Sequence, residues 1–212
     1  PLWLVNFSLR MNKKILVFFH ILLCSFYVNA QISITSLNTP YNQDFNTLAG
    51  TGTSSTVPAG WAFIETGTLG NISYTAGSGS SGTGDTYSFG SSAADRAFGG
   101  SQSGSLNPTI GARFTNNTGT TITSITLNYT GEQWRLGATG RVERIDFQYS
   151  TDAASLSTGN WVDENNLDFL SPVTSGTIGA LNGNTAISRT VIAAFTIPGL
   201  TINTGTDFWI RW

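Results

Sequence analysis

The chain has 212 residues, of which 40% are hydrophobic and 10% are charged, and its formal net charge is −2. Its histidine, cysteine, methionine and lysine residues all lie between residues 11 and 24. Residues 31–212 therefore lack the imidazole, thiol and amine groups on which most general-base, covalent and transition-metal chemistry depends.

The first 30 residues divide into two parts. Residues 1–10 precede a plausible initiator methionine and show no pattern of their own, so we interpret them as an upstream extension that is not native. Residues 11–30 have the three parts of a secretory signal peptide: a positive start, an apolar run over 15–28 and a small-residue exit at Ala30. That run is shorter than the roughly 20 residues a membrane-spanning helix needs. We expect a signal-peptide helix, cleavage near Ala30, and a secreted or cell-surface protein whose mature chain has no membrane span.

Residues 31–212 have the length of one domain with a sizeable core. They contain seven arginines and twelve carboxylates, a net charge of −5. The arginines are scattered among acidic residues, whereas nucleic-acid binding needs a basic patch, so we expect no nucleic-acid partner. Without cysteine this part forms no disulfide and depends on its core or on bound ions.

Apolar residues occupy alternate positions in four segments, which predicts half-buried strands. The segments are 125–129, 145–149, 191–197 and 208–212. Turn-forming clusters separate the strands, and no useful 3.6-residue period occurs. The sequence therefore predicts an all-β, jelly-roll-like β-sandwich. The Gly/Ser-rich segment 76–86 lacks the Gly-Lys-Ser/Thr ending of a phosphate loop, and its composition predicts a flexible surface loop.

Six short motifs stand out along the chain: Asp44-Phe45-Asn46, Pro58 with Gly60-Trp61, Tyr87-Ser88-Phe89-Gly90, Asp95-Arg96-Ala97, Gly131-Glu132-Gln133-Trp134-Arg135 and Trp209-Ile210-Arg211-Trp212. Together they resemble a jelly-roll-like domain found near the N-terminus of secreted, multidomain surface proteins of the Bacteroidota type. The resemblance covers residues 40–212, and the run 131–135 is its most specific part. It implies a β-sandwich with no assignable activity, often placed before lamin-tail-like, nuclease, phosphatase or sorting domains.

Members of that family continue beyond the strand that matches 209–212 into an acidic loop and a final strand. The resemblance therefore implies that 31–212 is a single β-sandwich domain lacking its last strand. Because an unpaired apolar edge invites aggregation, we expect one strand position to stay unfilled, with an open edge or groove beside 207–212.

Two interpretations fit the cluster formed by Glu132, Trp134 and Arg135. The cluster is either a sugar-binding platform, with Trp134 stacked beneath a carbohydrate, or a buried aromatic and ion-pair cluster between two sheets. Burial of aromatic and paired charged groups is commoner, and it is the interpretation we favour. Glu132 and Arg135 are three residues apart on an extended strand and are not expected to pair with each other. Trp161 is a further candidate ligand contact.

Carboxylates are the remaining candidates for chemistry. A glycoside hydrolase needs two of them facing each other across roughly 5 to 9.5 Å, and nothing in the sequence marks one as a raised-pKa acid. Calcium prefers oxygen ligands, and its candidate ligands are Asp152, Asp163, Glu164 and Asp168. No run approaches a recognised calcium loop, so we expect no obligatory cofactor and treat calcium as possible.

The sequence thus leaves three functional classes open. The first is a non-catalytic extracellular module for adhesion, spacing or binding within a larger exported protein. The second is a carbohydrate-binding module of a secreted degradative enzyme, with polysaccharide or cell-surface components as partners. The third is a hydrolase that uses carboxylates alone. Buried tryptophans favour the first class, and an exposed row of tryptophans favours the second.

Overall fold

The computed structural model describes residues 31–92 and 94–212. This part contains strands and two short 3-10 helices, which confirms the prediction of an all-β sandwich. The predicted signal peptide and the upstream extension lie outside the described residues. Among the described residues no helix has the length and apolar character needed to cross a membrane.

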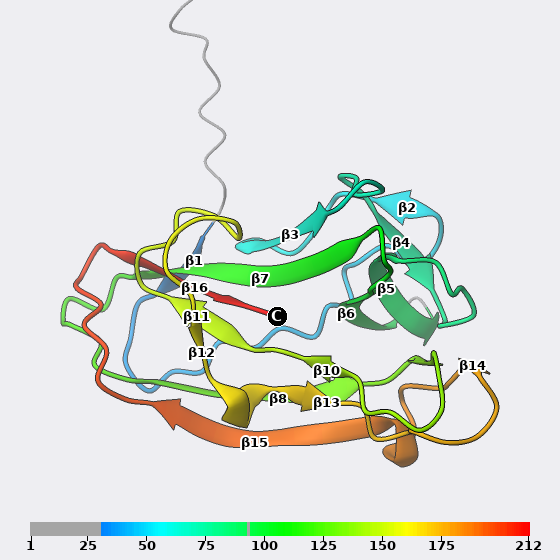
Figure 1. Ribbon diagram of the computed structural model, residues 1–212. Coiled ribbons are helices and arrows are strands. Elements are labelled where there is room, and N and C mark those ends of the chain that lie inside the picture. The colour runs from blue at the N-terminus through cyan, green and yellow to red at the C-terminus, as the bar shows by residue number, and fades with distance from the viewer. Residues whose placement is uncertain (1–30, 93) are drawn as a thin grey trace, which may run out of the picture.

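The upper layer in Figure 1 is a six-stranded sheet. Its strands run in the order β1-β7-β16-β11-β12, and β3 also pairs with β7. β1 is parallel to β7, and the other pairs are antiparallel. The strands are β1 (Ile32–Ile34), β3 (Trp61–Thr66), β7 (Asn107–Asn116), β11 (Gln148–Ser150), β12 (Val162–Asp163) and β16 (Asp207–Arg211).

The lower layer consists of strand pairs, of which the longest joins β8 (Ile125–Glu132) to β15 (Arg189–Ile197). The shorter elements are β9 (Arg135–Leu136) with β14 (Gly179–Ala180), β10 (Arg144–Ile145) with β13 (Phe169–Leu170), and the 3-10 helices η1 (Asn165–Leu167) and η2 (Ala186–Ser188). A four-stranded sheet closes one end in the order β2-β4-β5-β6. Its strands are β2 (Thr53–Ser54), β4 (Tyr74–Gly77), β5 (Asp85–Ser92) and β6 (Asp95–Ser101).

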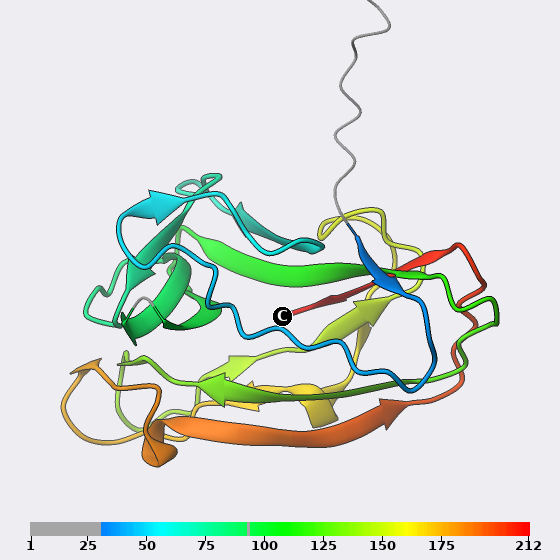
Figure 2. The ribbon, with the colours of Figure 1, turned by 180° about the vertical axis from the view of Figure 1, so that it is seen from behind.

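The main core lies between the two layers, where alternate residues of the long strands point inward. Phe114 on β7 and Phe208 on β16 stack with ring centroids 5.0 Å apart. Across the sandwich, β15 contributes the buried residues Ile192 and Ile197. The view from behind in Figure 2 shows the segment between β1 and β2 running along the gap between the layers. The predicted alternation at 125–129 and 208–212 is thus the inward face of β8 and β16. The prediction for 191–197 is wrong in its first half: Val191 and Ala193 are exposed and Ile192 is buried, because the register of β15 shifts between Ile192 and Phe195.

One predicted strand is divided between the two layers. Within 145–149, Ile145 belongs to β10 in the lower layer, whereas Tyr149 belongs to β11 in the upper sheet. The chain crosses between them at Phe147, which is fully buried and whose N–H donates to Asp168 Oδ1 at 2.8 Å. Alternation therefore marks Phe147 and Tyr149 correctly as core residues, whereas Ile145 is 39% exposed.

Of the open edge or groove expected beside 207–212, the open edge is wrong, although residues 208 and 210–212 do line a hollow. β16 lies inside the sheet, because Asp207–Arg211 pairs with β7 and Trp209–Arg211 pairs on the other side with β11. Periodicity predicts strands at 145–149 and at 208–212. It does not predict that β11 and β16 pair with each other, because this pairing joins residues about 60 positions apart.

Candidate functional site

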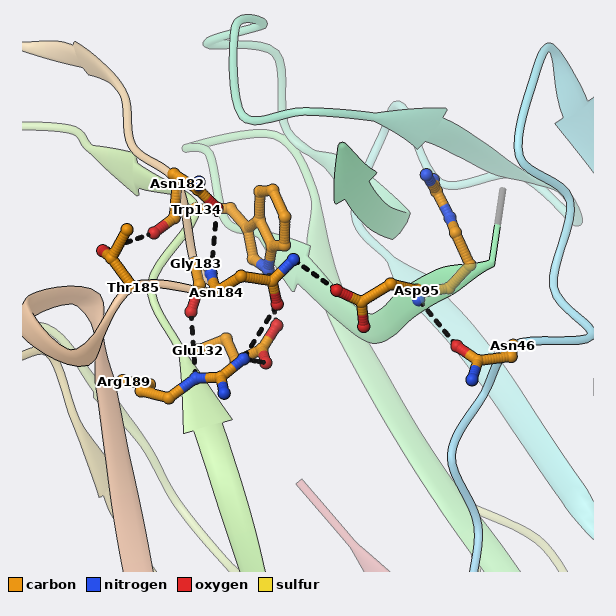
Figure 3. A network of polar contacts seen from close by, with 10 residues as sticks. Asn46, Asp95, Glu132, Trp134, Asn182, Gly183, Asn184, Thr185 and Arg189 are labelled. Carbon is orange, nitrogen blue, oxygen red and sulfur yellow. Dashed lines mark hydrogen bonds and ion pairs between the residues drawn. The ribbon is translucent and has the colours of Figure 1, made fainter. Parts of the chain in front are cut away.

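The residues of the most specific sequence run lie where β8 ends and β9 begins (Figure 3). Glu132 is the last residue of β8, and its carboxylate accepts two hydrogen bonds. Arg189 Nη2 donates to Oε1 at 2.6 Å, and Trp134 Nε1 donates to Oε2 at 3.0 Å. The ionic partner of Glu132 is therefore Arg189 on the neighbouring strand β15, and Glu132 does not pair with Arg135, as expected.

Trp134 is buried, with only 4% of its surface exposed. Phe89 on β5 stacks parallel to its ring with centroids 6.2 Å apart, and Tyr87 stacks on Phe89 at 4.9 Å. Gly183 lies against the indole so closely that a Cβ there would be 2.5 Å from its Nε1. The indole thus joins the end sheet to the lower layer. Nearby residues of the same protein cover the ring, so a sugar has no open face on which to stack.

Arg135 points away from Glu132 and holds the Gly/Ser-rich segment. Its Nη1 donates to the carbonyl oxygens of Gly79 and Ser80, each at 3.0 Å. Gly79 is buried, and its φ of +78° is a conformation that favours glycine. The segment predicted as a flexible surface loop is therefore fastened to the chain after β8. Composition predicts flexibility, but it does not identify a distant arginine that binds the loop's carbonyl groups.

The network around Glu132 extends to the end sheet through residues that the sequence did not single out as a site. Arg189 Nη2 also donates to Asn184 Oδ1 at 2.8 Å, and the Asn184 amide donates to Asp95 Oδ2 at the start of β6 (Figure 3). The next residue, Arg96, donates its backbone N–H to Asn46 Oδ1 at 2.9 Å. The one sequence feature that pointed to this part of the network was the segment 95–97, which is among the motifs that carry the family resemblance.

Trp161 lies in a different cluster. It packs against the buried Ala153, Leu156 and Trp209, and Arg211 places its guanidinium carbon 3.9 Å from the centroid of the Trp161 ring. The structure therefore does not bring Trp161 together with Trp134. Trp209 is buried, with 6% of its surface exposed. Trp61 is half-buried and stacks on Trp212 with centroids 6.1 Å apart.

The four candidate calcium ligands each accept hydrogen bonds from other residues of the protein. Asp152 accepts from the Asn160 N–H at 2.7 Å, and hydrogen bonds from Asn160 and Ser150 hold the pKa of Asp152 below its ordinary value. Asp163 accepts from a glutamine side chain, and Glu164 caps η1. Asp168 accepts the Phe147 N–H. Across residues 31–92 and 94–212, no three or more acidic, histidine or cysteine side chains are grouped as a metal site.

Two carboxylates that the sequence did not mark converge on one N–H group. The backbone N–H of Thr86 donates to Glu65 Oε1 at 2.7 Å and to Asp85 Oδ1 at 2.9 Å. Burial raises the pKa of Asp85, and the neighbouring Glu65 raises it further. Burial alone would raise the pKa of Glu65 too, but hydrogen bonds from Asn71 and Thr86 outweigh it and lower that pKa.

A hollow of about 2010 Å³ opens along β8. Its wall includes residues 121–135, which span all of β8, and residues 95–102, which span all of β6. Leu127 and Tyr129 pack against the core but remain only partly buried, and Trp212 also lines the hollow. This hollow is therefore lined by strands of different sheets, β8 and β6 among them.

Comparison of the chain with protein-family models, with curated proteins and with solved structures gives no match.

Proposed function

We propose that the chain is a non-catalytic β-sandwich module of an exported protein, serving adhesion, spacing or binding. The observation that supports this most directly is the use of Glu132, Trp134 and Arg135 in internal contacts. The carboxylate of Glu132 is bonded to Arg189 and Trp134, the indole is buried, and Arg135 binds loop carbonyls. Groups engaged in this way hold the layers together and are not free to bind a sugar or transfer a proton.

The sugar-binding alternative would require an aromatic face open to solvent. Phe89 lies between Tyr87 and Trp134, and the guanidinium of Arg211 lies over Trp161. Both candidate platforms are thus occupied by the protein itself, which supports a packing role for these rings.

A glycan array and a panel of polysaccharide hydrolysis assays on the full chain test the proposal. We expect neither retention nor hydrolysis. The matched variants are Trp134→Phe, which keeps an aromatic ring in the core, and Trp161→Ala, which removes the half-buried ring. Retention of a polysaccharide that Trp161→Ala abolishes would instead establish a carbohydrate-binding module. Hydrolysis that survives purification and is lost on substituting Glu65 or Asp85 would establish an enzyme.

Export is tested separately by expressing residues 11–212 in a secreting bacterium. We expect the protein outside the cytoplasm with Gln31 as its N-terminal residue, measured by mass spectrometry. Accumulation in the cytoplasm with residues 11–30 retained would contradict the exported location.

A further inference from the structure

Two half-buried carboxylates, Glu65 and Asp85, meet where β3 of the upper sheet contacts β5 of the end sheet. Glu65 lies on β3, Asp85 begins β5, and both accept the backbone N–H of Thr86, at 2.7 Å and 2.9 Å respectively. Charged groups that are removed from water are normally paired with an opposite charge. No ion pair formed within residues 31–92 and 94–212 includes either carboxylate. The pair therefore gathers negative charge without a cationic side chain to balance it.

Hydrogen bonds hold both carboxylates in a fixed orientation. Glu65 Oε2 accepts the Asn71 N–H at 3.0 Å and the Asn71 side-chain amide at 2.9 Å, and Asp85 Oδ2 accepts the Thr75 hydroxyl at 2.6 Å. The other oxygen of each group, Glu65 Oε1 and Asp85 Oδ1, accepts only the N–H that they share. A carboxylate oxygen has two lone pairs, so both of these oxygens can accept a further partner.

A third oxygen gives an independent indication of a ligand. Thr86 is fully buried, and its Oγ1 has no hydrogen-bond partner in the described chain. Its side chain is nevertheless close enough to act on Glu65: burial raises the pKa of Glu65, and the Asn71 N–H and the Thr86 side chain help to lower it by more. The Thr86 hydroxyl is thus turned toward Glu65 without meeting it in hydrogen-bond geometry. A buried hydroxyl that lacks a partner is uncommon, and beside two carboxylates it points to a cation.

The carboxylate pair is accessible to ions from the solvent. Asp85 and Thr75 line a pocket of about 280 Å³, together with Ser81 and Thr83 of the Gly/Ser-rich segment. Glu65 is also only half-buried. An ion can therefore reach the two carboxylates without unfolding the end sheet.

We propose that Glu65 Oε1, Asp85 Oδ1 and Thr86 Oγ1 bind a calcium ion, with water completing its coordination shell. Calcium takes about six to eight oxygen ligands in a flexible geometry. Residues 31–212 carry no histidine or cysteine, the ligands that zinc and copper favour. Two carboxylates give a weak site, so we expect a Kd of about 10⁻⁴–10⁻³ M, the range of extracellular modules.

The bound ion joins β3 to β5, and so the upper sheet to the end sheet, in a domain that has no cysteine for a disulfide. The four carboxylates that the sequence suggested as calcium ligands, at positions 152, 163, 164 and 168, take no part in this site. The calcium site goes beyond the proposed function and does not depend on it.

The probe is calcium chloride added to the full chain after metal has been removed with EDTA. Isothermal titration calorimetry measures binding, and magnesium chloride is the control for ionic strength and selectivity. We expect calcium to bind with the Kd given above and magnesium to bind at least about tenfold more weakly, because magnesium demands near-ideal octahedral geometry. The melting temperature should rise by about 3–10 °C at about 10 mM calcium.

Two charge-removing variants and one matched control assign the site. Glu65→Gln and Asp85→Asn keep the size of each side chain and should each weaken calcium binding at least about tenfold. Thr86→Val removes only the buried hydroxyl and should weaken it about threefold. Asp163→Asn removes an exposed carboxylate that the sequence suggested as a ligand, and it should leave calcium binding unchanged.

Amide chemical shifts of the wild-type chain provide a measurement that does not depend on the variants folding. Calcium should shift the amides of Asn71 and Thr86, which donate to the two carboxylates, and leave Asn160 beside Asp152 unchanged. Shifts at Asn160 without shifts at Thr86 would place the ion elsewhere and overturn the proposal.

Three other results would also overturn it. The first is no binding of calcium at about 10 mM, and the second is an equal effect of magnesium, which would indicate ionic strength alone. The third is a melting temperature that ignores calcium but changes with pH in a way that Asp85→Asn abolishes, which would assign the pair to a shared proton. None of these results alters the proposed non-catalytic role, which the glycan and hydrolysis assays decide.

Discussion

The end of β8 and its middle are built in opposite ways. At the end, Glu132 and its neighbours form a network in which side chains from β8, β15 and the end sheet satisfy one another. In the middle, Leu127 and Tyr129 remain partly exposed beside a main-chain edge that no described strand pairs. A sequence run that is specific enough to recognise therefore identifies the joint between the layers, whereas the unpaired main-chain edge lies in ordinary alternating residues next to it.

The largest expected effect is the loss of the aromatic joint in Trp134→Ala. Removing a buried tryptophan forfeits its burial and leaves a cavity, which typically costs about 3–5 kcal/mol. Chemical denaturation should show a fall of this size in the free energy of unfolding. Val191→Ala, at a residue 71% exposed, is the control and should change little. A loss below about 1 kcal/mol for Trp134→Ala would mean that the network does not hold the layers together.

Gly79→Ala tests whether the Gly/Ser-rich segment is fixed to this joint. A Cβ at Gly79 would lie 1.7 Å from the Trp134 carbonyl oxygen, and the φ of +78° is unfavourable for alanine. Overpacking and backbone strain together predict a loss of about 2–4 kcal/mol in the same denaturation experiment. Gly137→Ala has open space around its Cβ and should be nearly neutral. Equal stabilities of the two variants would show that the segment moves freely.

Glu132→Gln removes the charge from the network and keeps its shape. The side chain is 14% exposed and that of Arg189 is 35% exposed, so solvent weakens the pair, and we expect a loss of about 1–2 kcal/mol. Glu143→Gln is the matched control, since Glu143 and Arg141 are 51% and 63% exposed, and it should cost less than about 0.5 kcal/mol. A larger loss in the control than at Glu132 would contradict a structural role for the network.

The smallest effect concerns Tyr129, on the wall of the hollow. Burial raises the pKa of its hydroxyl from 10.0 to about 12. The folded protein therefore keeps this proton while the unfolded chain loses it, so the contribution to stability is complete below pH 10 and disappears as the pH rises toward 12. Unfolding free energies measured across this range should decline less steeply in Tyr129→Phe than in the wild type. Identical slopes would mean that Tyr129 is more open to water than its packing indicates.

Part of the candidate site could be predicted from local sequence. The segment 131–135 stood out by its motif, and the three-residue spacing correctly separated Glu132 from Arg135. The partner of Glu132 could not be predicted, because Arg189 is 57 residues away and meets it through the pairing of β8 with β15. An open strand edge was expected at 207–212, but β16 is paired on both sides and β8 pairs with β15 alone, because strand order decides which edge stays unpaired.

The sequence by itself determined that this chain is all-β and which residues of β8 and β16 face inward, since alternation with a period of two is a local property of extended backbone. In β15 the register shift between Ile192 and Phe195 breaks that period, so Ile192 faces inward in place of Val191. It also determined that residues 31–212 carry no histidine, lysine or cysteine for catalysis. Only the tertiary structure decided that β16 lies between β7 and β11, that Trp134 joins two sheets, and that β6 and β8 border one hollow. These features depend on hydrogen bonds and packing between segments that are far apart in the chain, and such long-range choices leave no periodic trace in the sequence.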